Sequence, residues 1–593
     1  MGKVPSAHIP NIKSRICIKQ CLFPVFVKSS GWCKFVLNDA AIMNRRELLK
    51  NLSICVPGIA IGNQLQASRR LMDQFGETMA AGPFTATWES LSAYKTPDWF
   101  RNAKFGIWAH WGPQCAPEEG DWYARKMYVE GSSQYKAHCK KYGHPSKFGF
   151  KDVIPTWKAE QWNPDELLAL YKKAGARYFM ALANHHDNFD LFNSRYQKTW
   201  NATKIGSQKD LVAGWEKAAR KQGLYLGVSV HAAHAWSWYE AAQRADKSGP
   251  YAGIPYDGKL SKIDGKGLWW QGLDPQELYE QHHALSENSL DDSMINKQWN
   301  WGNGVSVPSK AYCEHFFNRT IDLIDSYDPD MVYFDDTALP LWPVSDAGLR
   351  IAAHMYNRSI KKNGKLDAVI FGKILDETQR KCMVWDIERG QSNNIEPLPW
   401  QTDTCIGSWH YSRSLYENRT YKTAKTVIHN LADVVSKNGN LLLSVPVRGN
   451  GSIDELEQAI VEEIGEWMAI NSEAIYDTRP WVVYGEGPQM ESAAPLSRQG
   501  FNEGKGVPFT SSDIRFTQKN DTVYAIVMEW PENGQVTIKS LKRGASAMNK
   551  DISTVALLGS TQQLSFSRDE SGLHVTLPEN RNKISYGLTL KIN

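Results

Sequence analysis

Between about residues 100 and 470 the chain repeats one pattern: an amphipathic helix, a glycine, an apolar run, and then a polar or aromatic cluster. In one unit Asn163 is placed as the helix N-cap, Pro164 stands in the first turn, and Gly175 ends the helix. Residues 210–231 repeat the pattern. Helices that alternate with strands in this way predict parallel strands joined by right-handed crossovers.

The apolar runs predict eight strands, at 104–109, 177–183, 224–230, 331–334, 368–371, 383–386, 403–406 and 441–446. Near-continuously apolar strands fit a sheet that is covered on both faces. Eight is the number that a closed (β/α)8 barrel requires, and an open doubly wound sheet is the alternative. Reactive side chains follow several of these runs directly: His110, His185, His186, His231 and Asp335. Because barrel enzymes carry their active site at that end of the strands, we expect a (β/α)8-like barrel with its site there.

One long stretch inside the predicted barrel departs from this pattern. Residues 239–310 are rich in Gly, Asp, Lys and Trp and are much longer than an ordinary connection. They predict an elaborated loop over the barrel mouth, with Trp269, Trp270, Trp299 and Trp301 as candidate contacts.

The composition changes after the predicted barrel. A last helix is expected to open with a capping box from Ser452 to Glu455. Beyond it, short alternating strands with turn signals at Asn533-Gly534 and Ser571-Gly572 predict a small antiparallel β-sandwich. The expected domains are 68–478 for the barrel and 479–593 for the sandwich.

Residues 1–67 differ from the rest of the chain. From Met43 onward, Arg45 and Arg46 precede a short apolar stretch that reaches small residues near Ala67, which is typical of an export signal. The segment RRELLK resembles a twin-arginine translocation signal, and an amphipathic helix is the alternative reading. We expect an upstream extension, translation from Met43, export to the periplasm or the extracellular space, and no membrane span in the mature chain.

The composition narrows the class of function. The net charge is only +4, from 68 basic and 64 acidic residues without a long run of either sign, so a nucleic-acid partner is not expected. The 23 tryptophans and 24 tyrosines suit hydrated ring-shaped ligands, although such rings also fill cores. Outside residues 1–67, five widely spaced cysteines form no CxxC pair, so they indicate neither a disulfide framework nor a zinc site: Cys115, Cys139, Cys313, Cys382 and Cys405. No cofactor is expected, and a homo-oligomer is left open.

Six ordered motifs make the prediction specific: KFGIWAHWGP (104–113), GDWYARKMY (120–128), ANHHDNFDLF (183–192), PDMVYFDD (329–336), DIERG (386–390) and PWQTDTCIGSW (399–409). Together they resemble the retaining α-L-fucosidase family of glycoside hydrolases, over most of residues 95–480. The resemblance implies an exo-acting enzyme that releases terminal α-L-fucose from glycans by double displacement through a covalent fucosyl-enzyme. It also implies the appended β-sandwich.

The resemblance assigns the nucleophile to Asp335 and not to its neighbour Asp336. A retaining mechanism needs a second carboxyl about 5–5.5 Å away as acid/base. We expect Glu388 in this role, because it follows a short predicted strand and precedes the PWQTDTCIGSW motif by a suitable spacing. As an acid it should be partly desolvated, with a raised pKa. Three other acids remain competitors: Glu377, Asp386 and Glu396.

The resemblance also implies sugar contacts. His110, His185 and His186 match positions that hydrogen-bond hydroxyls, Trp122 matches a pocket wall, and Trp409 stacks on the sugar or fills the core. Three further substrate-binding candidates depart from the usual family residues: Asp121 in place of glutamate, His231 near a usual tyrosine, and Lys373 in place of arginine. The His-His pair also suggests a metal, but metal sites usually add carboxylate or thiolate ligands at suitable spacing, and the family offers no support for a metal, so none is expected.

Two other functions stay open. An α-L-galactosidase would use the same chemistry on a sugar that differs from fucose by one hydroxyl at C6. A hydrophobic pocket rejects such an added hydroxyl only weakly, so this substrate stays open. A catalytically inactive glycan-binding protein would have Asp335 or its partner displaced.

Overall fold

The structure is a computed structural model that describes residues 76–287, 289, 299–492, 500–546, 548, 550–579 and 584–593. The predicted export segment 1–67, with its start at Met43, lies outside the described residues.

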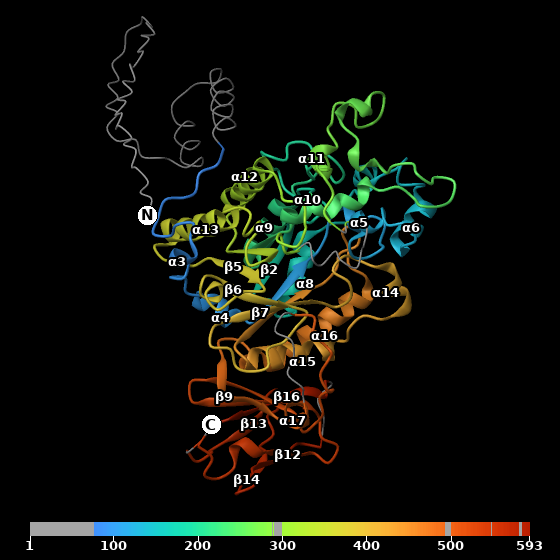
Figure 1. Cartoon of the computed structure of the whole chain (residues 1–593). Helices are drawn as coiled ribbons and strands as arrows, with labels where there is room; N and C mark the ends of the chain where they lie inside the picture. The colour runs from blue at the N-terminus through green and yellow to red at the C-terminus, as the bar shows by residue number, and fades with distance from the viewer. Residues whose placement is uncertain are drawn as a thin grey trace, which may run out of the picture. The chain divides into compact units, whose positions relative to one another are not determined.

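Eight parallel strands close into a barrel in chain order, with β8 pairing back to β1. They are β1 (Phe105–Ala109), β2 (Tyr178–Asn184), β3 (Tyr225–Val230), β4 (Met331–Thr337), β5 (Val369–Lys373), β6 (Val384–Glu388), β7 (Trp400–Cys405) and β8 (Gly439–Ser444). Figure 1 shows the barrel strands among the helices that cover them. The predicted (β/α)8 barrel is confirmed, and the open doubly wound sheet is wrong.

α-Helices follow six of the eight barrel strands, whereas in the described stretch from β5 to β7 no α-helix separates the strands, so the predicted alternation is wrong there. The longer ones are α8 (Pro164–Lys173), α9 (Leu211–Lys221), α12 (Lys310–Tyr327), α13 (Ala347–Asn363), α15 (Ala424–Ser436) and α16 (Glu455–Asn471). The shorter ones are α3 (Trp88–Leu91), α4 (Asp98–Ala103), α5 (Tyr123–Lys126), α6 (Ser133–Lys141), α7 (Phe150–Val153), α10 (Ala235–Trp238), α11 (Gln276–Tyr279), α14 (Arg413–Asn418) and α17 (Pro488–Ser492).

The local signals that end and begin helices are largely where the sequence places them. Asn163 caps α8 by accepting from the N–H of Glu166, with Pro164 in the first turn. The expected capping box of α16 is wrong by two residues. Asp454, not Ser452, caps this helix, because its carboxylate accepts from two backbone N–H groups, while Glu457 reaches back to the N–H of Asp454.

Strand β4 extends beyond its predicted end at Phe334 and includes both acids of the DD pair. Successive side chains of a strand point to opposite faces, so the two carboxylates diverge. Asp335 points toward Lys373 at the end of β5, whereas Asp336 is buried against Nε2 of His234 at 2.7 Å.

The insertion 239–310 divides between two locations. Nε1 of Trp299 donates to the backbone oxygen of Asp335 at 3.2 Å, and the ring of Trp301 stacks on His234, so both tryptophans lie at the barrel mouth. Nε1 of Trp269 instead donates to Asp152 of α7, and the ring of Trp270 lies near Nζ of Lys151, which belongs to the same helix as Asp152. Of the four tryptophans in the described part of the insertion, Trp299 and Trp301 therefore reach the ends of the strands, whereas Trp269 and Trp270 lie at α7.

The C-terminal region forms two antiparallel sheets that share one hydrophobic core, as a β-sandwich does. The five-stranded sheet has the order β13-β16-β11-β10-β9, and the three-stranded sheet β12-β15-β14. Their strands are β9 (Arg479–Glu486), β10 (Ile514–Lys519), β11 (Thr522–Glu529), β12 (Gln535–Ile538), β13 (Val555–Leu557), β14 (Ser565–Arg568), β15 (Leu573–Thr576) and β16 (Tyr586–Ile592). The turn Ser571-Gly572 joins the paired strands β14 and β15, whereas Asn533-Gly534 joins strands of different sheets.

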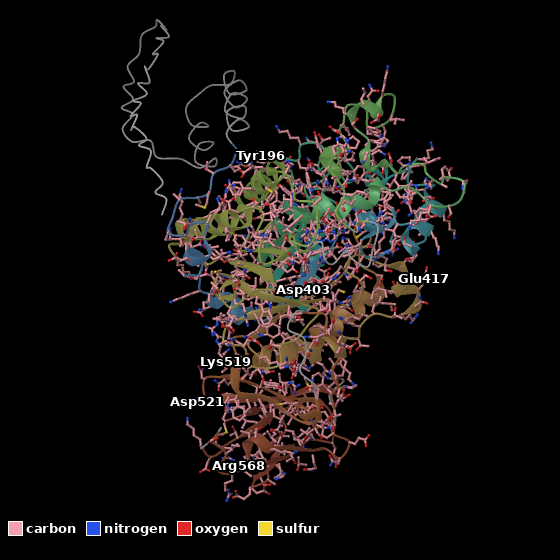
Figure 2. The ribbon with its side chains drawn as sticks, in the orientation of Figure 1. Tyr196, Asp403, Glu417, Lys519, Asp521 and Arg568 are labelled. Atoms are coloured by element: carbon pink, nitrogen blue, oxygen red, sulfur yellow. The ribbon has the colours of Figure 1, made fainter. Side chains whose placement is uncertain are left out.

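Helix α15 packs against strands β9, β10 and β16 of the sandwich. A buried ion-pair network fixes this contact: Asp433 of α15 binds Nε of Arg515 at 2.6 Å and Nζ of Lys437 at 2.7 Å. Figure 2 labels Asp403 in the barrel and Lys519 in the sandwich for orientation.

Two sequence-based expectations concern the chain as a whole. Within the described ranges, no helix has the length and apolar character needed to cross a bilayer. The five cysteines outside residues 1–67 are free thiols, and all except the half-buried Cys139 are buried.

Candidate active site

The predicted site residues converge on one end of the barrel. His110, His185 and His231 follow β1, β2 and β3 directly, while Lys373 and Glu388 are the last residues of β5 and β6. Since all eight strands are parallel, these side chains meet Asp335 of β4 at the carboxyl-terminal mouth.

Asp335 is held by cationic and hydrogen-bonding groups on three sides. Its Oδ1 lies 2.8 Å from Nζ of Lys373, and its Oδ2 lies 3.1 Å from Nε2 of His186 and 3.4 Å from Nδ1 of His231. Burial alone would raise the pKa of Asp335, but Lys373 and the two histidines hold it well below its ordinary range. The side chain is 17% exposed, so an ionised carboxylate faces the barrel mouth.

Glu388 shares its cation with Asp335. Its Oε2 lies 2.5 Å from the same Nζ of Lys373. The two carboxylate oxygens are therefore at most about 5.3 Å apart, an upper limit that is compatible with retaining geometry. Burial raises the pKa of Glu388 to about 7 against the lowering effect of Lys373, and the charge of Asp335 adds to the rise.

The three competing acids lie elsewhere. Asp386 is buried two residues deeper in β6, where Gln401 donates to it, and burial with the nearby Asp403 raises its pKa well above the usual range. Glu396 is buried and paired with Arg380. Glu377 is exposed. Of the four candidates, only Glu388 shares a hydrogen-bonding partner with Asp335.

Lys373 binds the two carboxylates rather than standing apart as a ligand contact. A third acid, Asp403, has its Oδ2 4.0 Å from the same nitrogen. Burial opposes the charge of Lys373, but Asp335 and Glu388 hold its pKa well above the ordinary value. Lys373 thus supplies one positive charge to two neighbouring carboxylates, Asp335 and Glu388.

The histidines differ in their hydrogen-bonding states. Gln114 uses its carbonyl for the N–H of Ala124, so its amide nitrogen donates to Nδ1 of His185 at 3.0 Å, which leaves Nε2 of this ring as a donor. Both nitrogens of His186 face oxygen atoms, the His231 carbonyl at 2.8 Å and Oδ2 of Asp335 at 3.1 Å.

Three of these rings are kept neutral. Burial lowers the pKa of His110 and of His185 well below the ordinary value, and neighbouring histidines add to the effect. Burial also lowers the pKa of His231 to about 4, although Asp335 opposes the shift. Neutral imidazole offers one donor and one acceptor, which is the pairing that a sugar hydroxyl requires.

Aromatic rings form the walls of the mouth. Trp122 stacks on Trp299 with ring centroids 5.7 Å apart, and Trp409 lies 4.9 Å from His110. Asp121 accepts from the backbone N–H of His410 at 2.7 Å, so it holds the loop that presents Trp409.

Sequence reasoning missed two groups at this site. The ring of His410 lies 4.6 Å from that of His185, and it follows directly on the PWQTDTCIGSW motif, which was the available signal. His234 binds Asp336 and stacks between Trp299 and Trp301. These partners lie far from His234 in the sequence, so no local pattern indicated its role.

The ligand atoms of His185, His186 and His231 lie within 4.8 Å of one another, a spacing that a metal ion could use. However, His186 already directs both nitrogens to oxygen acceptors, and Nδ1 of His185 accepts from Gln114. The expected absence of a metal stays a prediction.

Comparison with known proteins covers the barrel and most of the sandwich. The alpha-L-fucosidase family model matches residues 71–473, and the alpha-L-fucosidase C-terminal domain model matches residues 508–593. The tissue alpha-L-fucosidase of Rattus norvegicus is 26% identical over 84% of this chain and 90% of its own, and that of Homo sapiens is 25% identical over 84% and 88%. A crystal structure of Thermotoga maritima alpha-fucosidase shares the fold with a TM-score of 0.61, at 24% identity, over 86% of this chain and 100% of its own. From the family model and the fold together, the chain belongs to the alpha-L-fucosidase family of glycoside hydrolases.

Proposed function

We propose that the protein is an exo-acting retaining α-L-fucosidase, with Asp335 as nucleophile and Glu388 as acid/base. One observation carries the assignment: the two carboxylates bind one lysine nitrogen, which keeps them within the separation that double displacement needs. The partner is a fucosylated oligosaccharide or polysaccharide.

In the first step, ionised Asp335 attacks the anomeric carbon while the bond from that carbon to the aglycone oxygen breaks. Glu388, whose pKa is raised to about 7, starts protonated and transfers its proton to the leaving oxygen. The products of this step are a covalent fucosyl-enzyme and a free aglycone.

In the second step, Glu388 acts as a base. Esterification removes the negative charge of Asp335, which had helped to raise the pKa of Glu388, so its carboxylate form becomes more favourable. It accepts a proton from water, the resulting oxygen attacks the anomeric carbon, and Asp335 departs. Two inversions return fucose with its original configuration.

Sugar recognition follows from the remaining groups of the mouth. The neutral rings of His110, His185 and His231 offer hydrogen bonds to hydroxyls, whereas Trp409 offers an apolar face to the C6 methyl group. Trp122 closes the wall through its stack with Trp299.

A fluorinated fucosyl donor tests the assignment directly. We expect it to trap a covalent adduct on Asp335, in a peptide identified by mass spectrometry. The variant Asp335→Asn should abolish turnover but keep the cooperative thermal unfolding transition of a folded protein. An adduct on another residue would reassign the nucleophile. Absence of both adduct and hydrolysis would favour the inactive glycan-binding protein, and a higher rate on the nitrophenyl α-L-galactoside would favour the galactosidase.

Azide rescue tests the acid/base. Glu388→Ala should retain activity on substrates with good leaving groups, lose it on natural glycosides, and give with azide a product of retained configuration. Rescue of Asp335→Asn by azide should instead give the opposite configuration, because azide then replaces the nucleophile. The same product from both variants would contradict these roles.

We also propose that the protein is exported to the periplasm or outside the cell, on the basis of the Arg45-Arg46 pair and the apolar stretch after it. Changing Arg45 and Arg46 to lysine should retain the protein inside the cell, as cell fractionation would show. N-terminal sequencing of the exported protein should give a start near Ala67, and unaltered export of the double variant would argue against the twin-arginine route.

A further inference from the structure

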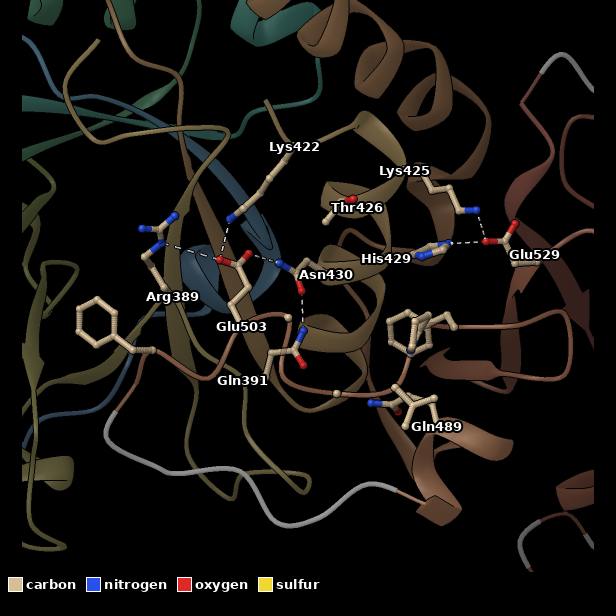
Figure 3. A pocket seen from close by; sticks show the side chains of 16 residues that line it. Arg389, Gln391, Lys422, Lys425, Thr426, His429, Asn430, Gln489, Glu503 and Glu529 are labelled. Carbon is tan, nitrogen blue, oxygen red and sulfur yellow. Dashed lines mark hydrogen bonds and ion pairs between the residues drawn. The ribbon is translucent and has the colours of Figure 1, made fainter. Parts of the chain in front are cut away.

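A second pocket, of about 650 Å³, lies outside the barrel mouth (Figure 3). Its lining comes from residues 389–391 after β6, residues 422–430 at the start of α15 and residues 501–509, together with Gln489 of α17 and Glu529 of β11. None of the catalytic or histidine side chains described above lies in its wall, so it is a separate site.

The pocket wall is continuous with the strand that carries Glu388. The N–H of Phe501 donates to the backbone oxygen of Glu388 at 2.7 Å, and the N–H of Glu503 donates to that of Arg389 at 2.8 Å. A Cβ at Gly500 would lie 2.6 Å from the Glu388 carbonyl, and the φ of this residue is +92°, so glycine permits the close approach.

The charged groups of the pocket are largely paired with one another. Nζ of Lys422 lies 2.6 Å from Glu503, whose carboxylate also lies 3.9 Å from Nε of Arg389, and Lys425 pairs with Glu529 (Figure 3). Such a lining lacks the concentrated positive field that phosphate or nucleic acid binding requires.

The remaining lining groups suit a hydrated sugar. The amide of Asn430 donates to Glu503 and accepts from Gln391, so planar polar groups are held in fixed orientations. Phe501, which also lines the pocket, is 57% exposed. An exposed apolar ring and fixed hydrogen-bonding groups in one pocket are the combination that recognises carbohydrate.

The position of the pocket relative to the reaction defines its occupant. The leaving oxygen must come within about 3 Å of the Glu388 carboxyl, so the aglycone emerges on the β6 side of the mouth. The guanidinium of Arg389 lies 5.9 Å from the ring centre of Trp409 on the sugar side and 3.9 Å from Glu503 in the pocket. A chain of sugars leaving the mouth on this side would cross Arg389 and reach the pocket.

We propose that this pocket binds the distal sugars of the aglycone, those beyond the sugar that bears fucose, in a neutral oligosaccharide substrate. The proposal rests on the proposed function, because it takes the reaction at Asp335 and Glu388 as given.

The test compares substrates of different length. For the wild-type protein, kcat/KM should be higher on fucosylated oligosaccharides long enough to reach the pocket than on fucosyl disaccharides. In Phe501→Ala the ratio of the two values should fall about fivefold, through KM of the long substrate, because a stacking face is lost. Phe566→Ala changes another exposed phenylalanine, on β14 of the sandwich; it is the matched control and should leave the ratio unchanged.

Binding gives an independent readout. With free fucose in excess to fill the mouth, calorimetry should detect the defucosylated oligosaccharide binding to the wild-type chain, and binding should weaken in Phe501→Ala. Equal ratios in wild type and variant, or an equal loss on short and long substrates, would overturn the proposal. Failure of the proposed function is distinguishable, because the wild-type protein would then not hydrolyse even nitrophenyl α-L-fucoside.

Discussion

Replacing Lys373 by methionine removes the one positive charge that the two central carboxylates share, at nearly constant side-chain volume. In the native protein this nitrogen lies 2.8 Å from Asp335 and 2.5 Å from Glu388. Activity requires Asp335 ionised and Glu388 protonated, so kcat/KM should rise with pH as Asp335 loses its proton and fall near pH 7 as Glu388 does.

The direction and size of the effect follow from these contacts. A neighbouring cation stabilises the ionised form of a carboxyl, so its loss raises the pKa of both Asp335 and Glu388. An opposite charge at this range is worth about 1–3 pH units. Because the two side chains are only 17% and 19% exposed, solvent screens little of the effect. Both limbs of the pH profile of Lys373→Met should therefore move to higher pH by about 1–3 units.

The assay is kcat/KM on nitrophenyl α-L-fucoside from the acidic to the alkaline range. Lys373→Arg keeps the charge and should keep both limbs near their native positions. Lys437→Met removes another buried lysine, which is paired with Asp433 in α15, and should leave the profile unchanged. Unmoved limbs in Lys373→Met, or a falling limb displaced to lower pH, would refute the electrostatic account of this site.

Three further predictions concern individual side chains. Asp336→Asn should keep most of the activity of the wild type but lower the free energy of unfolding by about 1–3 kcal/mol, since the buried contact with His234 loses its charge; a loss of turnover as complete as in a nucleophile variant would contradict this. Trp299→Ala should reduce kcat/KM about tenfold, because Asp335 loses a backbone contact and the mouth loses a stacked wall; unchanged kinetics would show that the insertion does not shape the site. Asp433→Asn should cost about 3–5 kcal/mol in chemical denaturation without changing KM, since it leaves buried cations unpaired; an unchanged unfolding midpoint would show that the network contributes nothing.

Most of the eight strands were predictable because strands buried on both faces of a parallel barrel are largely apolar, and several are followed directly by a reactive side chain. Strand β7 has mostly polar residues, and its predicted start at residue 403 is three residues too late. The same regularity predicted that the strand-end residues would gather at one mouth. The barrel prediction places β4, β5 and β6 side by side, but it could not show that one nitrogen of Lys373 contacts both Asp335 and Glu388, because that contact depends on strand register and side-chain direction.

Other features depended on still longer separations in the chain. The contact of residue 501 with Glu388 joins positions more than a hundred residues apart and has no pattern in either segment. His410 was missed for a different reason: its ring meets His185 through a loop after β7, where a histidine beside a tryptophan reads equally well as core or surface.

The hydrogen bonds between residues 500–503 and the end of β6 have a consequence for how this protein can be recombined. The match to the catalytic family model ends at residue 473, so a domain exchange designed from sequence alone would join two relatives at this boundary between barrel and sandwich. A join made there would separate Glu388 from the segment that braces its backbone. The segment that supports Glu388 therefore extends to about residue 503, and a chimera should take residues up to this point from the same parent as its barrel.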